Sequence, residues 1–217
     1  MQLPENVILE AVVGSRAYGL DRPSSDEDVM GVYVSPTLDI LGLRPLPETI
    51  NHHDPDITHH EAGKFVRLAM KCNPTIVELL WMDEYRVLTQ EAQALLNIRQ
   101  AFLSNTVRNS YGGYAVSQAR KMQKRDGIED WQRYGKNVRH CFRLLQQGTQ
   151  LLTTGLMTVR VPNAEGLWAL SEQPIDVVVE RFEAEFATFR ALPSVLPDKP
   201  DVETINEALL AIRLAHL

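Results

Sequence analysis

Two apolar runs near the start of the chain predict a pair of strands, Val7–Val13 and Asp28–Val34. Both runs are rich in β-branched residues, which pack well in sheets. The first contains a single charged residue, Glu10, so we expect it to be largely buried. Between the runs, a turn at Gly14-Ser15 and a short helix over Arg16–Leu20 are expected. Gly19 and Pro23 break any helix that forms and return the chain toward the second strand.

Further short elements of both kinds are expected up to about residue 90. After a proline-rich loop over Ser35–Pro47, the pattern predicts strands at Glu48–His53 and Asp56–His59 and helices at Glu61–Met70 and Thr75–Met82. We interpret Glu78, in the second helix, as a solvated carboxylate, with a role beside an active site as the alternative.

From Glu91 onward the strand signals fade and helical periodicity dominates. Helices are expected at Glu91–Leu103, Thr106–Lys124, Trp131–Leu152, Gly166–Leu170, Ile175–Leu192 and Val202–Leu214, with a β-prone edge segment at Leu156–Pro162. The predicted fold class is therefore α+β, with a small mixed-sheet core in residues 1–90 and a mostly helical domain in residues 91–217.

Composition limits the possible classes of protein. The net charge of −6 argues against a globally basic nucleic-acid binder but leaves room for a local basic groove. No run of 18 apolar residues predicts a membrane span, and the N-terminus lacks the apolar core of a signal peptide. The two cysteines, Cys72 and Cys141, are expected to be reduced and buried, so we expect a cytoplasmic protein.

The acidic triplet that opens the second strand predicts a metal site. Asp26 and Asp28 are two residues apart, so in extended chain both carboxylates point to the same face, with Cα atoms about 6.5 Å apart. Two ionised carboxylates that close repel each other unless a cation lies between them. Mg²⁺ favours one or two carboxylates together with substrate phosphates, and Mn²⁺ is an alternative.

The Gly-Ser pair fits the same chemistry. Gly14 allows a backbone N–H to approach a phosphate closely, and a helix N-terminus favours anions. Ser15 can donate its hydroxyl to a phosphate oxygen, and Arg16 can add a positive charge.

Gly-Ser, about ten residues, then Asp-x-Asp resembles the signature of the DNA polymerase β-like nucleotidyltransferases. The text GSRAYGLDRPSSDEDVMGVYV is similar to the predicted branch named for an RNA repair pathway. The resemblance implies a nucleotidyltransferase core, an appended helical bundle and a cleft between them. It implies transfer of a nucleoside monophosphate from an NTP such as ATP to a hydroxyl acceptor, either an RNA end or a protein, with release of pyrophosphate.

The resemblance also implies a third carboxylate, which completes a two-metal site from a neighbouring strand. Asp56 fits the family pattern of Asp followed by apolar residues and a helix, with Glu61 as the competitor and Asp54 more remote. The expected catalytic and metal-binding residues are therefore Asp26, Asp28 and Asp56.

Four histidines, His52, His53, His59 and His60, gather around this position. Adjacent strand residues face opposite ways, which gives poor ligand geometry for a transition metal. We therefore interpret them as polar residues beside the site, with His59 the one expected to touch substrate.

A basic stripe is predicted on the long helix Trp131–Leu152. Lys136, His140 and Arg143 are spaced i, i+4 and i+7, so they share a face opposite an apolar one. We expect these charges to point outward and to hold a triphosphate or an RNA backbone.

Two other classes of function remain open. The chain could be an antitoxin-like relative whose task is to bind a partner, or a nucleotide sensor that binds an NTP without turnover. A disturbed Gly-Ser pair or a lost Asp would favour either one, and the sequence shows neither.

Overall fold

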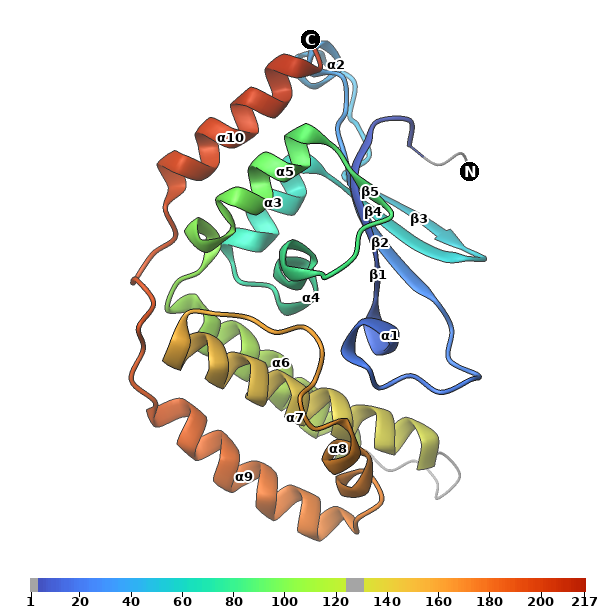
Figure 1. Ribbon diagram of the computed structural model, residues 1–217, viewed down its shortest axis with the longest axis vertical. Coiled ribbons are helices and arrows are strands. Elements are labelled where there is room, and N and C mark those ends of the chain that lie inside the picture. The colour runs from blue at the N-terminus through green and yellow to red at the C-terminus, as the bar shows by residue number, and fades with distance from the viewer. Residues whose placement is uncertain (1–3, 124–130) are drawn as a thin grey trace. The chain divides into compact units, whose positions relative to one another are not determined.

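The computed structural model describes residues 4–123 and 131–217, shown as a ribbon in Figure 1. The chain forms two compact units. The first, the sheet unit, comprises Met1–Lys71, Thr75–Phe102 and Pro200–Leu217, and the second, the helical unit, comprises Cys72–Pro74 and Leu103–Lys199. The described part of the chain contains no helix with the length and apolar character needed to cross a membrane.

A five-stranded mixed sheet organises the sheet unit. Its strands are β1 (Val7–Val13), β2 (Asp28–Tyr33), β3 (Thr49–His53), β4 (Asp56–Glu61) and β5 (Val87–Leu88), in the order β3-β4-β2-β1-β5. β2 and β4 are parallel, and the other neighbouring pairs are antiparallel. The four longer strands match the predicted ones closely, and the mixed sheet with many helices confirms the α+β class.

Helices flank this sheet and close its core. They are α1 (Gly14–Tyr18), α2 (Thr37–Leu41), α3 (Ala62–Met70), α4 (Pro74–Val77), the 3₁₀ turn η1 (Glu78–Trp81), α5 (Gln90–Asn97), the 3₁₀ turn η2 (Arg99–Phe102) and α10 (Val202–Ala215). α3 and α5 contact the sheet, and the C-terminal α10 packs on α3, α5 and η2 (Figure 1). Fully buried apolar side chains from strands and helices meet here, among them Leu9, Ala11, Val32, Phe65, Leu79 and Leu95.

The compact units differ from the ranges 1–90 and 91–217 expected from the sequence. Residues up to 102 and the last helix, α10, pack with the sheet unit. An ion pair between Arg213 of α10 and Glu61 of β4 joins these distant parts of the sequence, with both side chains mostly buried. Helical periodicity identifies α5 and α10 as helices, but it does not reveal which core they cover.

In the described residues of the helical unit, the helices are α6 (Thr106–Gln123), α7 (Trp131–Thr154), α8 (Ala164–Leu170) and α9 (Ile175–Ala191). α6 packs along α7, and α9 packs on both. Gly112 and Gly148 allow this close approach, because a Cβ at either position would crowd the ring of Phe189. The predicted helix end at Lys124 lies outside the described residues.

The prediction of a β-prone edge at Leu156–Pro162 is wrong, since the segment forms no strand. Its backbone is bonded instead by side chains of α7. Gln147 Nε2 donates to the carbonyls of Thr158 and Val159, and Gln150 Oε1 accepts from Thr158 N–H at 3.1 Å. Because these backbone groups already have partners, the segment needs no neighbouring strand.

Both cysteines are buried free thiols, as the sequence predicts. Burial raises the pKa of the Cys141 thiol to about 12, so this thiol is protonated at neutral pH.

Arg108 of α6 should contribute to the stability of the helical unit. Its guanidinium donates to the carbonyls of Phe189, Arg190 and Leu192 at 3.0, 3.1 and 2.7 Å, where α9 ends. Because hydrogen bonds from charged groups are the stronger ones and Arg108 is partly exposed, Arg108→Met should cost about 1–2 kcal/mol in urea unfolding. Arg190→Gln, at an exposed position, is the matched control and should change stability by less than about 0.5 kcal/mol. Equal midpoints for the two variants would contradict this assignment.

Candidate active site

The turn at Gly14 lies against the carboxylate of Asp28. Gly14 follows β1 directly and adopts a positive φ of 69°, a conformation that glycine adopts without strain. The antiparallel pairing of β1 with β2 places Val13 opposite Asp28. A side chain at position 14 would collide with the Asp28 carboxylate. The 14-residue spacing in sequence thus becomes direct contact in the fold.

The short helix α1 carries Ser15 and Arg16 and is held in place by contacts of its last residues. It ends at Gly19, which is left-handed, and Leu20 N–H donates to the carbonyl of Ser15 at 2.9 Å. Tyr18, the last residue of α1, donates its hydroxyl to the carboxylate of Glu78. Glu78 is only 1% exposed, so the expectation of a solvated carboxylate is wrong. Glu78 instead holds α1 in place from η1.

Asp28 and Asp56 lie side by side at the ends of neighbouring strands. Each is the first residue of its strand, and the parallel register of β2 and β4 pairs them directly. Matched residues on adjacent parallel strands project to the same face of the sheet. Asp28 is half-buried and Asp56 is exposed, so this edge can receive a ligand.

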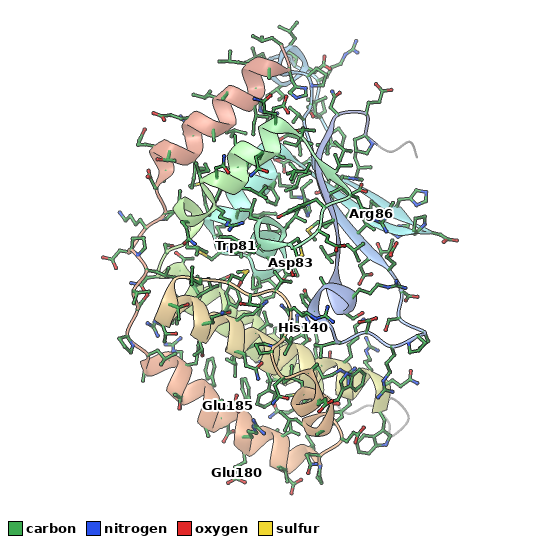
Figure 2. All side chains as sticks on the ribbon, viewed as in Figure 1. Trp81, Asp83, Arg86, His140, Glu180 and Glu185 are labelled. Carbon is green, nitrogen blue, oxygen red and sulfur yellow. The ribbon has the colours of Figure 1, made fainter. Side chains whose placement is uncertain are left out.

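Asp26 lies two residues before β2, in a segment without regular secondary structure, and is exposed. The middle acid of the triplet, Glu27, pairs with arginines. It forms an ion pair with Arg86, labelled in Figure 2, and lies 3.6 Å from the Arg16 guanidinium. Arg16 also donates to the carbonyl of Ser25 at 3.1 Å. Glu27 is therefore paired with two arginines. Its neighbours Asp26 and Asp28 are the acids of the triplet predicted to bind a metal.

Glu61, the alternative third ligand, has structural partners instead. Its carboxylate accepts from Gly63 N–H at 2.8 Å, which caps the N-terminus of α3, and it pairs with Arg213. Glu61 is buried, whereas Asp56 is exposed. These contacts favour Asp56 as the carboxylate that remains available to a metal.

The donor set fits a hard cation that substrate helps to bind. Within the described residues, no group of three or more His, Cys, Asp or Glu side chains is close enough together to hold a metal. A pair of carboxylates with phosphate oxygens is nevertheless the arrangement that Mg²⁺ prefers. The Asp28–Asp56 pair would supply the protein's share of such a site.

His59 faces away from these carboxylates. It lies three residues after Asp56 on β4, so strand alternation directs it to the opposite face of the sheet. His59 is 1% exposed, and its Nε2 lies 2.8 Å from Oε2 of Glu10, across Gly31. A Cβ at position 31 would collide with the imidazole, so glycine is what allows the ring to reach Glu10. The expectation that His59 touches substrate is not supported.

His60 and His52 have local contacts on β3, β4 and the turn between them. His60 Nδ1 lies 3.0 Å from Thr49 Oγ1, and His52 Nδ1 lies 3.0 Å from the carbonyl of Pro55. Burial, followed by the nearby Lys64, lowers the pKa of His60 to about 4. This ring is neutral at physiological pH.

The predicted basic stripe on α7 belongs to the helical unit, and only part of it faces outward. Lys136 is exposed and His140 is half-buried, but Arg143 is 1% exposed and donates to Gln147 Oε1 at 2.6 Å. The expectation that all three charges point outward is therefore wrong for Arg143. Burial, together with Arg143, Lys121 and Lys136, lowers the pKa of His140 to about 3, so its ring is neutral at pH 7.

Some residues of the site escaped sequence reasoning. Arg86 and Tyr18 act through partners about 60 residues away, and β5, the two-residue strand that begins one residue after Arg86, is too short to give a periodic signal. For the contact between Glu10 and His59, the sequence did hold a signal. Glu10 is a lone charge in an apolar strand, and a charge removed from water requires a partner.

Comparisons with known proteins identify the family of this chain. No curated protein matches the chain. A solved structure, a nucleotidyltransferase-like protein from Exiguobacterium sibiricum 255-15, is 9% identical, with a TM-score of 0.36 over 96% of this chain and 74% of that one. No conclusion is drawn from so low a score. The model of the RNA repair pathway DNA polymerase beta family matches residues 2–174, most of the chain and all the site residues above. The chain therefore belongs to the RNA repair pathway DNA polymerase beta family.

Proposed function

We propose that the protein is a metal-dependent nucleotidyltransferase that moves a nucleoside monophosphate from an NTP to a hydroxyl acceptor. Family membership supports nucleotidyltransferase activity in general. The observation that carries the finer proposal is the arrangement of Gly14, Asp28 and Asp56. A glycine turn lies against one strand carboxylate, and a second carboxylate lies beside it in parallel register.

In the proposed reaction, the acceptor oxygen bonds to the α-phosphorus of the NTP. The bond from that phosphorus to the bridging oxygen breaks, pyrophosphate leaves, and the acceptor proton passes to solvent or a nearby base. The enzyme's contribution to such a transfer is mainly positioning and electrostatic stabilisation.

Asp28 and Asp56, with Asp26 from the extended lead-in, would hold Mg²⁺ or Mn²⁺. When bound, the metal ions would supply charge that offsets the developing negative charge and would lower the pKa of the attacking hydroxyl. Two such ions are the proposed number. The carboxylates keep their place because β2 and β4 fix their register.

The Gly14 turn would receive the outer phosphates of the NTP. Gly14 leaves its backbone accessible, and the Ser15 hydroxyl can donate to a phosphate oxygen. Arg16, 44% exposed, can turn from Glu27 toward a phosphate, and Arg86 would then keep Glu27 neutralised. Tyr18 and Glu78 would act as positioning residues, because they hold α1 rather than touch the nucleotide.

Within the helical unit, Lys136, His140 and Arg143 remain proposed anion-binding residues. His140 would act as a neutral hydrogen-bond donor, since its pKa of about 3 keeps it uncharged. Arg143, which is buried and bonded to Gln147, would fix the position of the neighbouring helix residues.

Pyrophosphate release tests the function as a whole. The purified protein is incubated with each of the four NTPs, Mg²⁺ and candidate acceptors, and pyrophosphate and labelled acceptor are measured. Metal-dependent release with a labelled acceptor supports a transferase. NTP binding without release, across RNA, protein and small-molecule acceptors, would instead support a nucleotide sensor or an antitoxin-like binding protein.

Asp28→Asn should reduce Mg²⁺-dependent turnover by at least about 100-fold. Losing even an outer partner of a metal ligand typically costs 10- to 100-fold, so loss of a ligand should cost at least the upper value. The metal-free fold should keep its stability, because the change removes repulsion between Asp28 and Asp56. Asp21→Asn, an exposed acid in the preceding loop, is the matched control and should keep full activity. Full activity in Asp28→Asn would refute the site.

Substitutions of Asp56 and Glu61 should affect different properties: Asp56 the turnover and Glu61 the stability of the fold. Asp56→Asn should lose turnover by about 100-fold or more while changing unfolding free energy by less than about 0.5 kcal/mol. Glu61→Gln should cost about 2 kcal/mol of stability, because it disrupts a mostly buried charged pair with Arg213, and it should keep turnover per folded molecule. The reverse pattern would identify Glu61 as the third ligand.

A further inference from the structure

Glu27 uses each of its carboxylate oxygens on a different arginine. Its Oε1 accepts a hydrogen bond from Arg86, which is labelled in Figure 2, and its Oε2 lies 3.6 Å from Nη1 of Arg16. Arg16 belongs to α1, whereas Arg86 lies in the segment just before β5. Only the fold of the sheet unit therefore brings these three charges together.

The two arginines are held with different firmness. Arg86 is fixed to the sheet through its backbone, because its N–H donates to the carbonyl of Glu10 on β1 at 2.7 Å. Its guanidinium forms both a hydrogen bond and an ion pair with Glu27. Arg16 lies beyond hydrogen-bond distance of that carboxylate, and its other nitrogen donates to the carbonyl of Ser25 at 3.1 Å. Of the two arginines, Arg16 is therefore the one that can leave Glu27 at small cost.

Arg16 also lies close to the turn where the outer phosphates are proposed to bind. It is in the same short helix as Gly14, whose backbone lies against the Asp28 carboxylate. Its side chain is 44% exposed, so a ligand can reach it. A phosphate group is anionic and offers oxygens as acceptors, as the Glu27 carboxylate does. The triphosphate and Glu27 therefore compete for one guanidinium.

The surrounding acids explain why two arginines are needed. Three consecutive acids, with Glu27 in the middle, lead into β2, and Asp56 lies beside the last of them. Carboxylates held this close repel a triphosphate unless cations offset their charge. Because Arg86 stays paired with Glu27, the departure of Arg16 leaves this carboxylate compensated. Arg16 then brings its positive charge to the ligand.

We propose that Glu27 is an internal substitute for a substrate phosphate, which holds Arg16 while no NTP is bound and releases it to the triphosphate. Arg86 is then a positioning residue, which keeps Glu27 paired and the acidic segment in place after Arg16 has moved. A monophosphate has no outer phosphates with which to displace Glu27, so the arrangement favours triphosphates. The inference rests on the proposed function for the binding of an NTP at the Gly14 turn, but not on turnover.

The test is isothermal titration calorimetry of the full chain at low salt, with saturating Mg²⁺ and no acceptor. Non-hydrolysable analogues of the four NTPs are titrated, and the one that binds most tightly is used for the variants. Glu27→Gln should lower its Kd about two- to fivefold, because an exposed ion pair has that worth and no longer holds Arg16. A merely structural role for Glu27 predicts the opposite sign, since loss of both pairs would loosen the acidic segment. Equal or weaker binding by this variant would overturn the proposal.

An Arg16→Met background separates release of Arg16 from simple repulsion. There, the further change Glu27→Gln should alter the Kd by less than about twofold, because no guanidinium is left to release. The same gain in both backgrounds, or an equal gain for the matching monophosphate, would show that Glu27 merely repels anions and would overturn its proposed role. Glu48→Gln is the matched control, since it breaks an exposed ion pair with Arg67 in the same unit and should leave the Kd unchanged.

Arg86 has its own readout. Arg86→Met should raise the Kd about two- to fivefold, because Glu27 then keeps Arg16, whereas Arg86→Met combined with Glu27→Gln should bind as tightly as Glu27→Gln alone. Weaker binding by the double variant would mean that Arg86 contacts the phosphates itself, which would overturn its positioning role. If wild type binds an analogue and the variants do not differ, only this inference fails. Absence of binding by wild type and Glu27→Gln alike would refute the proposed NTP site, and this inference with it.

Discussion

The parallel pairing of β2 with β4 is the constraint on which the candidate active site depends. It sets Asp28 beside Asp56, although 28 residues of chain separate them. The antiparallel pairing of β1 with β2 then brings Gly14 against Asp28. Register in a sheet with buried strands is strongly specified, because a slip of one residue would turn the apolar side chains outward. The fully buried Leu9, Ala11 and Val32 therefore keep two exposed or half-buried carboxylates in place.

The same sheet separates two sets of polar residues by face. Asp28 and Asp56 share one face, whereas Glu10 and His59 pair across Gly31 on the other. A charged residue in an apolar strand is tolerated here because a buried ring supplies its partner. Likewise, the Glu61 carboxylate caps α3 and pairs with Arg213. Glu10 and Glu61 thus have structural partners, His59 and Arg213, within the sheet unit.

Much of the fold could be predicted from the sequence, because local patterns determine it. The runs around Gly14 and Asp28 gave strands with correct bounds, and helical periodicity gave α6, α7, α9 and α10. Tertiary partners could not be predicted. Arg143 has the spacing of a surface residue yet is buried against Gln147, and Glu78 has the sequence context of a solvated acid yet bonds to Tyr18. Contacts across tens of residues leave no periodic signal, and the order in which helices cover a core depends on the whole chain.

We propose that Asp28 and Asp56 together hold a divalent cation with an NTP. The most direct measurement is a crystal structure with Mn²⁺ and a non-hydrolysable NTP analogue, with the ion located by anomalous scattering. We expect an anomalous peak coordinated by oxygens of both carboxylates and by phosphate oxygens, with the phosphates at the Gly14 turn. A peak bound by the histidines of β3 and β4, or a nucleotide bound away from Gly14 with no ion at Asp28 and Asp56, would contradict it.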